Sequence, residues 1–142
     1  MQFLHTMLRV ADLDAALAFW CDALGFVESR RSVYDAGRFT LVFLRAPGDA
    51  PGGAEIELTY NWDQTEAYGG GRNFGHIAVG VDDVYAACAR LEAHGVIILR
   101  PPRDGRMAFV RSPDQQSVEL LQRGAALLPA EPWLSRANSG SW

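Results

Sequence analysis

Hydrophobic and polar residues alternate along the stretch from Glu55 to Trp62. The alternation gives a predicted strand an apolar face and a polar face, made respectively by Ile56, Leu58, Tyr60 and Trp62 and by Glu55, Glu57, Thr59 and Asn61. This pattern is typical of a half-buried strand. An acidic second face ordinarily contacts only water, so the strand alone does not assign a function to Glu57.

The pattern of the first 63 residues predicts a strand, a helix and three more strands. The strands are expected at 4–10, 26–31, 38–45 and 55–62. Asp12 is expected to cap the helix and Gly25 to end it. The inward positions of the helix follow helical spacing: Leu13, Ala16, Leu17, Trp20 and Leu24.

The same order of elements starts again at His76. We expect a strand at 76–81, a helix that begins at Asp82 or Asp83 and ends at His94 and Gly95, and strands at 96–100, 107–112 and 117–121. A shift of 71 residues places His76 on His5. The sequence therefore predicts an α+β fold of two related βαβββ modules.

The module boundaries follow from the same pattern. The modules are expected at 1–63 and 74–123, joined by a mobile connector at 64–73 that contains three successive glycines. The tail, 124–142, has no clear periodicity. We expect it to be irregular and to pack on the surface or on a partner.

Composition narrows the class of partner. The chain has 142 residues, of which 49% are hydrophobic and 21% charged, and a net charge of −4. This balance argues against a nucleic-acid or anionic-membrane surface. No apolar stretch approaches the roughly 20 residues of a membrane span, and the first residues do not resemble a signal peptide. We therefore expect a cytoplasmic protein with a small-molecule partner.

Cysteine and lysine usage excludes some chemistry. Cys21 and Cys88 both lie within predicted helices, so we interpret them as reduced core residues and not as catalytic thiols. There is no lysine, which excludes a lysine Schiff base. The arginines remain to bind any carboxylate of a ligand.

The repeat places chemically useful side chains at matched positions. His5 and His76 lie in the first strands of the two halves, and Glu57 and Glu119 lie in the last strands. A single histidine in a strand is more often a structural residue. Here a histidine and a glutamate recur at matched positions in both halves, which indicates a site for a divalent transition metal. Glu55 shares a face with Glu57 and is the competing acid. We leave out the third histidine, which follows the second helix.

Four segments resemble glyoxalase I of the vicinal oxygen chelate superfamily. They are Leu-His-Thr-Met-Leu-Arg-Val at 4–10, Ile-Glu-Leu-Thr-Tyr-Asn-Trp at 56–62, Phe-Gly-His-Ile-Ala at 74–78, and Ser-Pro-Asp at 112–114 followed by Val-Glu-Leu at 118–120. The resemblance implies cupped mixed sheets and a homodimer with the metal between a module of each subunit. One subunit would supply His5 and Glu57, and the other His76 and Glu119.

The resemblance also implies the chemistry. The metal would be Zn²⁺ or Ni²⁺, with Co²⁺ possible, and the substrate the hemithioacetal of glutathione and methylglyoxal, converted to S-lactoylglutathione. Glu119 would move the proton, with Glu57 as its counterpart. The substrate-binding residues implied are Arg9 and Asn61 at the glutamyl end, Arg72, and Arg103, Arg106 and Met107 in the lid segment. The lid is short, and Gln115 stands where the family has glycine. These departures leave open which thiol and which aldehyde the protein accepts.

Two other functions stay open. One is a different metalloenzyme of the superfamily, such as an epimerase, a thiol transferase or an extradiol dioxygenase. A dioxygenase would hold Fe²⁺ through three protein ligands, so a fourth ligand at Glu57 argues against it. The other is a non-catalytic protein that sequesters a drug or toxin, which would not need the four ligands.

Overall fold

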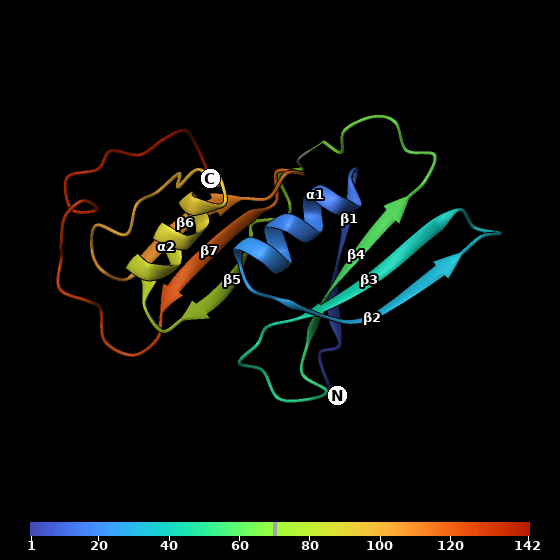
Figure 1. The fold of residues 1–142 in the computed structure, drawn as a ribbon, viewed down its shortest axis with the longest axis horizontal. Coiled ribbons are helices and arrows are strands. Elements are labelled where there is room, and N and C mark those ends of the chain that lie inside the picture. The colour runs from blue at the N-terminus through green and yellow to red at the C-terminus, as the bar shows by residue number, and fades with distance from the viewer. Residues whose placement is uncertain (70) are drawn as a thin grey trace. The chain divides into compact units, whose positions relative to one another are not determined.

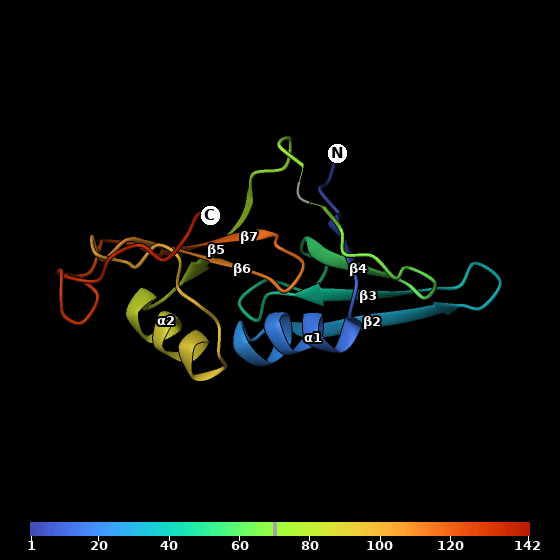
Figure 2. The same cartoon turned by 90° about the horizontal axis from the view of Figure 1, so that it is seen from above.

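The structure, a computed structural model, describes residues 1–69 and 71–142. The chain divides into two compact units, Met1–Gly69 and Gly70–Trp142. Gly70, in the expected glycine-rich connector, lies outside the described residues. Figures 1 and 2 show that each unit pairs a small sheet with a helix that covers one of its faces.

The first unit has the predicted strand, helix and three strands. Its elements are β1 (His5–Val10), α1 (Leu13–Leu17), η1 (Ala18–Ala23), β2 (Val27–Tyr34), β3 (Phe39–Arg45) and β4 (Glu55–Asn61). The strand order is β1-β4-β3-β2. Strand β1 is parallel to β4, and the other neighbours are antiparallel. The βαβββ order predicted for this half is confirmed.

The first helix differs from its prediction in its second half. Asp12 caps it as expected, because its Oδ1 accepts a hydrogen bond from the Ala15 amide at 2.9 Å. From Ala18 the helix continues as the π-helical segment η1. The extra residue per turn changes the inward face, so that Phe19 and Ala23 are buried whereas Leu17 and Leu24 are only half-buried.

The core of the first unit lies between this helix and one face of the sheet. Its buried side chains include Leu8, Val10, Trp20, Phe26, Val42, Leu44, Ile56 and Leu58. Trp20 is fully buried and makes edge-to-face contacts with Phe19 and Phe26. Because strand side chains alternate, the apolar face that packs on the helix leaves His5 and Glu57 on the opposite face.

The second unit repeats most of this order. Its elements are β5 (His76–Val81), α2 (Val84–Ala93), β6 (Met107–Arg111) and β7 (Ser117–Gln122). The strand order is β5-β7-β6, with β5 parallel to β7 and β6 antiparallel to it. Of the two candidate caps for α2, Asp83 is the cap, since its Oδ1 accepts from the Tyr85 and Ala86 amides at 2.9 Å.

The expectation of a strand at 96–100 is wrong. Only an isolated bridge between Arg100 and Phe109 is found there. The Leu99 and Arg100 amides both donate to the Phe109 carbonyl oxygen, and Pro101 follows directly. Proline has no amide hydrogen, so the ladder cannot extend in that direction.

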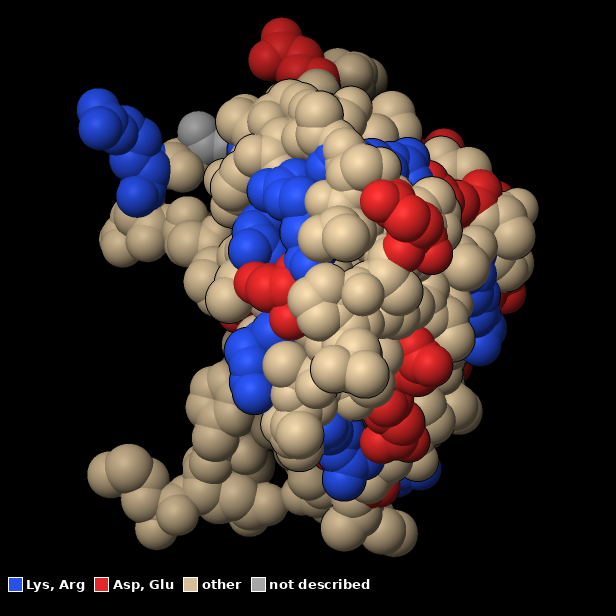
Figure 3. Space-filling model, turned by 90° about the vertical axis from the view of Figure 1, so that its left-hand side faces the viewer, with Lys and Arg blue, Asp and Glu red and all other residues tan. Residues whose placement is uncertain are grey.

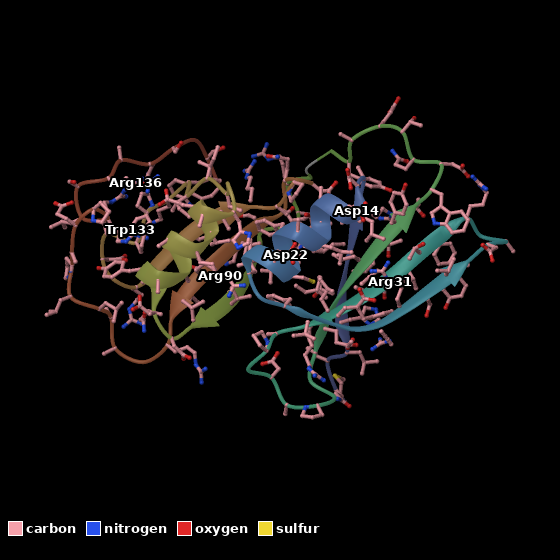
Figure 4. All side chains as sticks on the ribbon, viewed as in Figure 1. Asp14, Asp22, Arg31, Arg90, Trp133 and Arg136 are labelled. Atoms are coloured by element: carbon pink, nitrogen blue, oxygen red, sulfur yellow. The ribbon has the colours of Figure 1, made fainter. Side chains whose placement is uncertain are left out.

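The tail, 124–142, is irregular and packs on the second unit. Trp133 is 5% exposed. Its ring is covered by the Arg136 guanidinium, which is also ion-paired with Glu92 of α2 at 2.5 Å. Figure 4 shows Trp133 and Arg136 together beside α2. The tail is thus a fixed part of this unit.

Two composition-based expectations can be compared with the structure. Cys21 and Cys88 are both free thiols. Burial, followed by the negative charge of Glu92, raises the pKa of Cys88 to about 12, which makes it unreactive. None of the helices among the described residues is long and apolar enough to cross a membrane. On the face shown in Figure 3, acidic and basic side chains are interspersed.

Candidate metal centre

The first unit brings His5 and Glu57 together. His5 begins β1, and Glu57 lies on the neighbouring strand β4. The distance from His5 Nε2 to Glu57 Oε2 is 3.0 Å, and the two side chains are 38% and 13% exposed. We call this pair the first half-site. Both atoms that could bind a metal therefore point to the same place on the solvent-facing side of the sheet.

Two neighbours hold the first half-site in place. Phe43 of β3 lies opposite Glu57 in the sheet and meets the His5 ring edge-on, with centroids 5.7 Å apart. The Thr59 hydroxyl donates to Glu57 Oε1 at 3.1 Å. The ring contact restricts the imidazole, and the hydroxyl fixes the carboxylate oxygen that does not face His5.

The competing acid, Glu55, has other partners. Its carboxylate accepts from the Ser29 hydroxyl and is ion-paired with the Arg30 guanidinium. The hydrogen bond from Ser29, together with Arg30, holds the pKa of Glu55 below its ordinary value. Glu55 is therefore part of a charged pair beside the half-site, and Glu57 is the acid that faces His5.

The second unit repeats this arrangement of an imidazole beside a carboxylate. His76 begins β5, Glu119 lies on β7, and the distance from His76 Nε2 to Glu119 Oε2 is 3.1 Å. Their exposed fractions are 44% and 13%. Phe109 lies opposite Glu119 and meets the His76 ring edge-on, with centroids 5.5 Å apart. We call His76 and Glu119 the second half-site.

The two half-sites have the donor types of a transition-metal centre, imidazole nitrogen and carboxylate oxygen. Each brings two donor atoms to within hydrogen-bond distance of each other, so each supplies two of the ligands that a divalent cation needs. Within the part of the chain that the structure describes, no single cluster contains three or more His, Cys, Asp or Glu side chains suited to a metal.

The expected glutamyl-binding residues lie on the same sheet face as the first half-site. Arg9 is exposed on the strand face of His5, and it has further contacts of its own. Asn61 ends β4 on the face of Glu57, where its side-chain amide donates to the Tyr68 hydroxyl at 3.0 Å. Arg72 is exposed in a bend ahead of β5.

The expected lid residues belong to the second unit. Arg103 Nη1 donates to the Arg136 carbonyl and to Asn138 Oδ1, both at 2.9 Å, so its guanidinium holds the tail. Arg106 is exposed, directly ahead of β6. Met107 begins β6 on the same face as Phe109 and is half-buried.

Sequence reasoning missed the aromatic residues of the site. Phe43 and Phe109 sit at matched positions, each opposite a glutamate, yet they read as ordinary strand residues. Aligning the third strands of the two halves would have found them. Arg30 and Trp142, which cover these two rings, carry no comparable signal in the sequence.

Comparison with known proteins places the chain in a family. The profile of the Glyoxalase/Bleomycin resistance protein/Dioxygenase superfamily matches residues 2–120. The chain is 44% identical over 128 residues to the lactoylglutathione lyase of Neisseria meningitidis serogroup B, covering 87% of this chain and 91% of that protein. It is 43% identical over 127 residues to a probable lactoylglutathione lyase of Synechocystis, covering 86% and 95%.

A solved structure gives the same result. The trypanothione-dependent glyoxalase I of Leishmania major is 39% identical, with a TM-score of 0.79 over 86% of each chain. The fold and the paired half-sites thus define an α+β protein with a duplicated unit. The chain belongs to the Glyoxalase/Bleomycin resistance protein/Dioxygenase superfamily. The resemblance found in the sequence is confirmed.

Proposed function

We propose that the protein is a metal-dependent lyase of the glyoxalase I type. It converts the hemithioacetal of methylglyoxal and glutathione to S-lactoylglutathione. The observation that carries the proposal is the duplicated pair, with imidazole-to-carboxylate distances of 3.0 and 3.1 Å. Similarity to lactoylglutathione lyases over most of the chain supports the reaction.

The four half-site residues, His5, Glu57, His76 and Glu119, would hold one divalent cation. Their nitrogen and oxygen donors can hold Ni²⁺, Zn²⁺ or Co²⁺. When bound, the cation supplies Lewis-acid stabilisation of the negative charge that develops on the adjacent substrate oxygens.

Glu119 is the base in this proposal, and the two half-sites differ in a way that favours it. Glu57 is held by the Thr59 hydroxyl two residues further along the strand. The position two residues after Glu119 is Leu121, which has no hydroxyl. Glu119 is therefore less restrained and can turn toward the substrate, whereas Glu57 keeps its orientation.

The proton transfer follows from this difference. The Glu119 carboxylate takes the proton from C1 of the hemithioacetal and returns it to C2, while the hydroxyl proton on the C1 oxygen moves to the C2 oxygen. Its exposed fraction of 13% means that little water reaches it, which limits exchange of the proton with solvent. Glu57 faces the other prochiral side of the substrate.

Substrate orientation follows from the charged groups near the first half-site. Arg9 and Asn61 bind the glutamyl end of glutathione, because guanidinium and amide groups suit its carboxylate. The Tyr68 hydroxyl fixes the direction of the Asn61 amide. Arg72, Arg106 and Met107 contact the remainder of the substrate, as does Arg103 where the tail leaves its guanidinium accessible.

Cytoplasmic location agrees with this substrate. Glutathione keeps cytosolic thiols reduced, and Cys21 and Cys88 are free thiols. A cytoplasmic protein would therefore be in the same compartment as glutathione, its proposed co-substrate.

The experiment is an assay for thioester formation from methylglyoxal and glutathione by metal-depleted protein, with Ni²⁺, Zn²⁺, Co²⁺ or Fe²⁺ added back separately. We expect no turnover without metal and recovery with Ni²⁺, Zn²⁺ or Co²⁺. Recovery with Fe²⁺ alone would favour a dioxygenase. Purified protein that folds normally, binds no divalent ion and lacks turnover would favour a binding protein.

The complete ligand set is proposed to form in a homodimer, where the first half-site of one subunit faces the second half-site of the other. The test mixes two inactive double variants, His5→Ala with Glu57→Ala and His76→Ala with Glu119→Ala. A shared site leaves one of the two sites of each mixed dimer intact, so random exchange should restore about a quarter of wild-type activity. No recovery, with mixed dimers present, would contradict the shared site.

A further inference from the structure

The phenylalanine of each half-site is covered by a different kind of side chain. In the first, the Arg30 guanidinium lies 3.5 Å from the centroid of the Phe43 ring. In the second, the Trp142 indole is stacked on Phe109, with centroids 5.7 Å apart and planes 27° apart. A tail residue thus takes the place that a strand arginine has in the first unit.

One substitution between the halves accounts for the exchange. Arg100 pairs with Phe109 as Arg30 pairs with Phe43. Ser117 lies opposite His76, as Glu55 lies opposite His5. Ser117 carries no negative charge, so it cannot form with Arg100 the ion pair that Glu55 forms with Arg30. Arg100 instead donates to the Met107 carbonyl at 2.6 Å and to Asp104 Oδ2 at 2.9 Å, which leaves the Phe109 ring to Trp142.

The tail is attached firmly enough to place the indole. The Leu127 amide donates to the Gly105 carbonyl at 2.9 Å, and the Ser139 amide donates to the Leu99 carbonyl at 2.8 Å. At Gly105 the two segments are so close that a Cβ atom would lie 2.0 Å from the Leu127 carbonyl oxygen. Trp142 is only three residues beyond the attachment at Ser139.

We propose that Trp142 is a specificity-determining residue that contacts the apolar substituent of the 2-oxoaldehyde. The inference rests on the proposed function. Trp142 and His76 both contact the Phe109 ring, so the indole lies one ring away from the metal-binding imidazole. The indole is 41% exposed, which leaves part of its surface for a ligand.

The two sides of the proposed substrate then match the two half-sites. Near the first, Arg30 and Glu55 form a charged pair and Arg9 is exposed. Near the second, Trp142 and Met107 provide apolar surface on the face of Glu119, over the buried Phe109 ring. An aromatic substituent gains more from this surface than a methyl group, because stacked rings add to simple burial.

The test compares two hemithioacetals of glutathione, formed from methylglyoxal and from phenylglyoxal. In the metal-loaded protein, Trp142→Ala should lower kcat/KM about fivefold for the phenylglyoxal adduct and less than about twofold for the methylglyoxal adduct. Trp142→Phe keeps a ring and should recover most of the loss. Leu128→Ala is the control on the tail, because Leu128 is 87% exposed, and it should leave both substrates unchanged.

Five outcomes decide the proposal. A selective loss with Trp142→Ala and recovery with Trp142→Phe supports it. An equal loss for both adducts, with an unchanged thermal unfolding midpoint, overturns it, as does no loss. An equal loss with a lowered midpoint assigns Trp142 a purely structural role and also overturns it. Wild-type protein without turnover of the methylglyoxal adduct refutes the proposed function, and the role of Trp142 with it.

Discussion

The two half-sites share their ligand geometry but differ in what surrounds it. Each places an imidazole about one hydrogen-bond length from a carboxylate and sets the imidazole against a phenylalanine. Around the first are Thr59 and a charged pair, and around the second are Leu121 and an indole. Under the proposed function, the shared part would bind the metal, and the divergent part would decide which carboxylate reacts and where each end of the substrate lies.

The largest expected difference between the halves is catalytic. Glu119→Gln should retain metal and lower kcat by about 10²- to 10⁴-fold, the range for loss of a general base. Glu57→Gln should cost less, because Glu57 is the more restrained ligand. Rates of thioester formation, with metal content measured on the same samples, check this. Equal losses would contradict the assignment, and full activity in Glu119→Gln would exclude it.

Metal binding should show no such difference. Residues that only support metal ligands already change affinity 10- to 100-fold, so His5→Ala and His76→Ala should each weaken Ni²⁺ binding by at least about 100-fold, to a similar extent. Competition with a chromogenic chelator measures both. His94→Ala is the matched control, since His94 is exposed at the end of α2. A tenfold disparity between the two half-site variants would show that the pairs are not equivalent.

Exchanging the residues opposite the histidines should affect the two units unequally. Ser117→Glu should lower the free energy of unfolding by about 3 kcal/mol, because position 117 is 7% exposed and Arg100 is engaged elsewhere. Glu55→Ser should cost about 1 kcal/mol, since Arg30 remains half-exposed to water.

Urea denaturation measures both changes. Ser117→Ala is the control, because within the described residues the Ser117 hydroxyl is buried without a hydrogen-bond partner. That variant should be near neutral. A neutral Ser117→Glu would mean that Arg100 can turn to pair with the new carboxylate, which would weaken our explanation for Trp142 on Phe109.

The smallest effect concerns the ion pair that engages Arg100. Burial raises the pKa of Asp104, but hydrogen bonds from Arg100 and from the Arg106 and Met107 amides lower it further, so that it lies below its ordinary value. The contribution of the Asp104 carboxylate to the stability of the folded protein is present above the unfolded-state pKa of about 3.9. It is lost as pH falls through the pKa of the folded state.

Wild-type protein should accordingly lose stability more steeply between about pH 5 and pH 2 than Asp104→Asn, by less than about 1 kcal/mol because the carboxylate is 44% exposed. Urea denaturation at a series of pH values measures this difference. Asp49→Asn, at an exposed turn of the first unit, should follow the wild-type curve. A steeper loss in Asp104→Asn would reverse the sign and contradict the assignment.

The sequence predicts most of the fold because its signals are local. Period-two alternation and the helix caps, Asp12 and one of Asp82 and Asp83, correctly place seven strands and two helices among the described residues. The failures have physical causes that local pattern does not contain. The π-helical turn after Leu17 depends on packing of Phe19 and Trp20, and the bridge at Arg100 depends on where two prolines end the ladder.

The sequence likewise predicts one part of the candidate site and not the other. The repeat predicts His5, Glu57, His76 and Glu119, because each pair lies on adjacent strands whose register follows from the fold. It leaves Glu55 as a competing acid on the same face, and the structure shows that Glu55 is instead bound to Arg30. Nor does it place Trp142 on Phe109, since the two are far apart in sequence and the tail has no periodicity.

Titration of metal-depleted protein with Ni²⁺ tests the central claim most directly, with wild-type protein and the two double variants in which one half-site is replaced by alanine. The account predicts one tightly bound ion per chain in the wild type, and loss of that tight binding in both double variants. Two ions per chain, or tight binding that survives removal of either half-site, would contradict it.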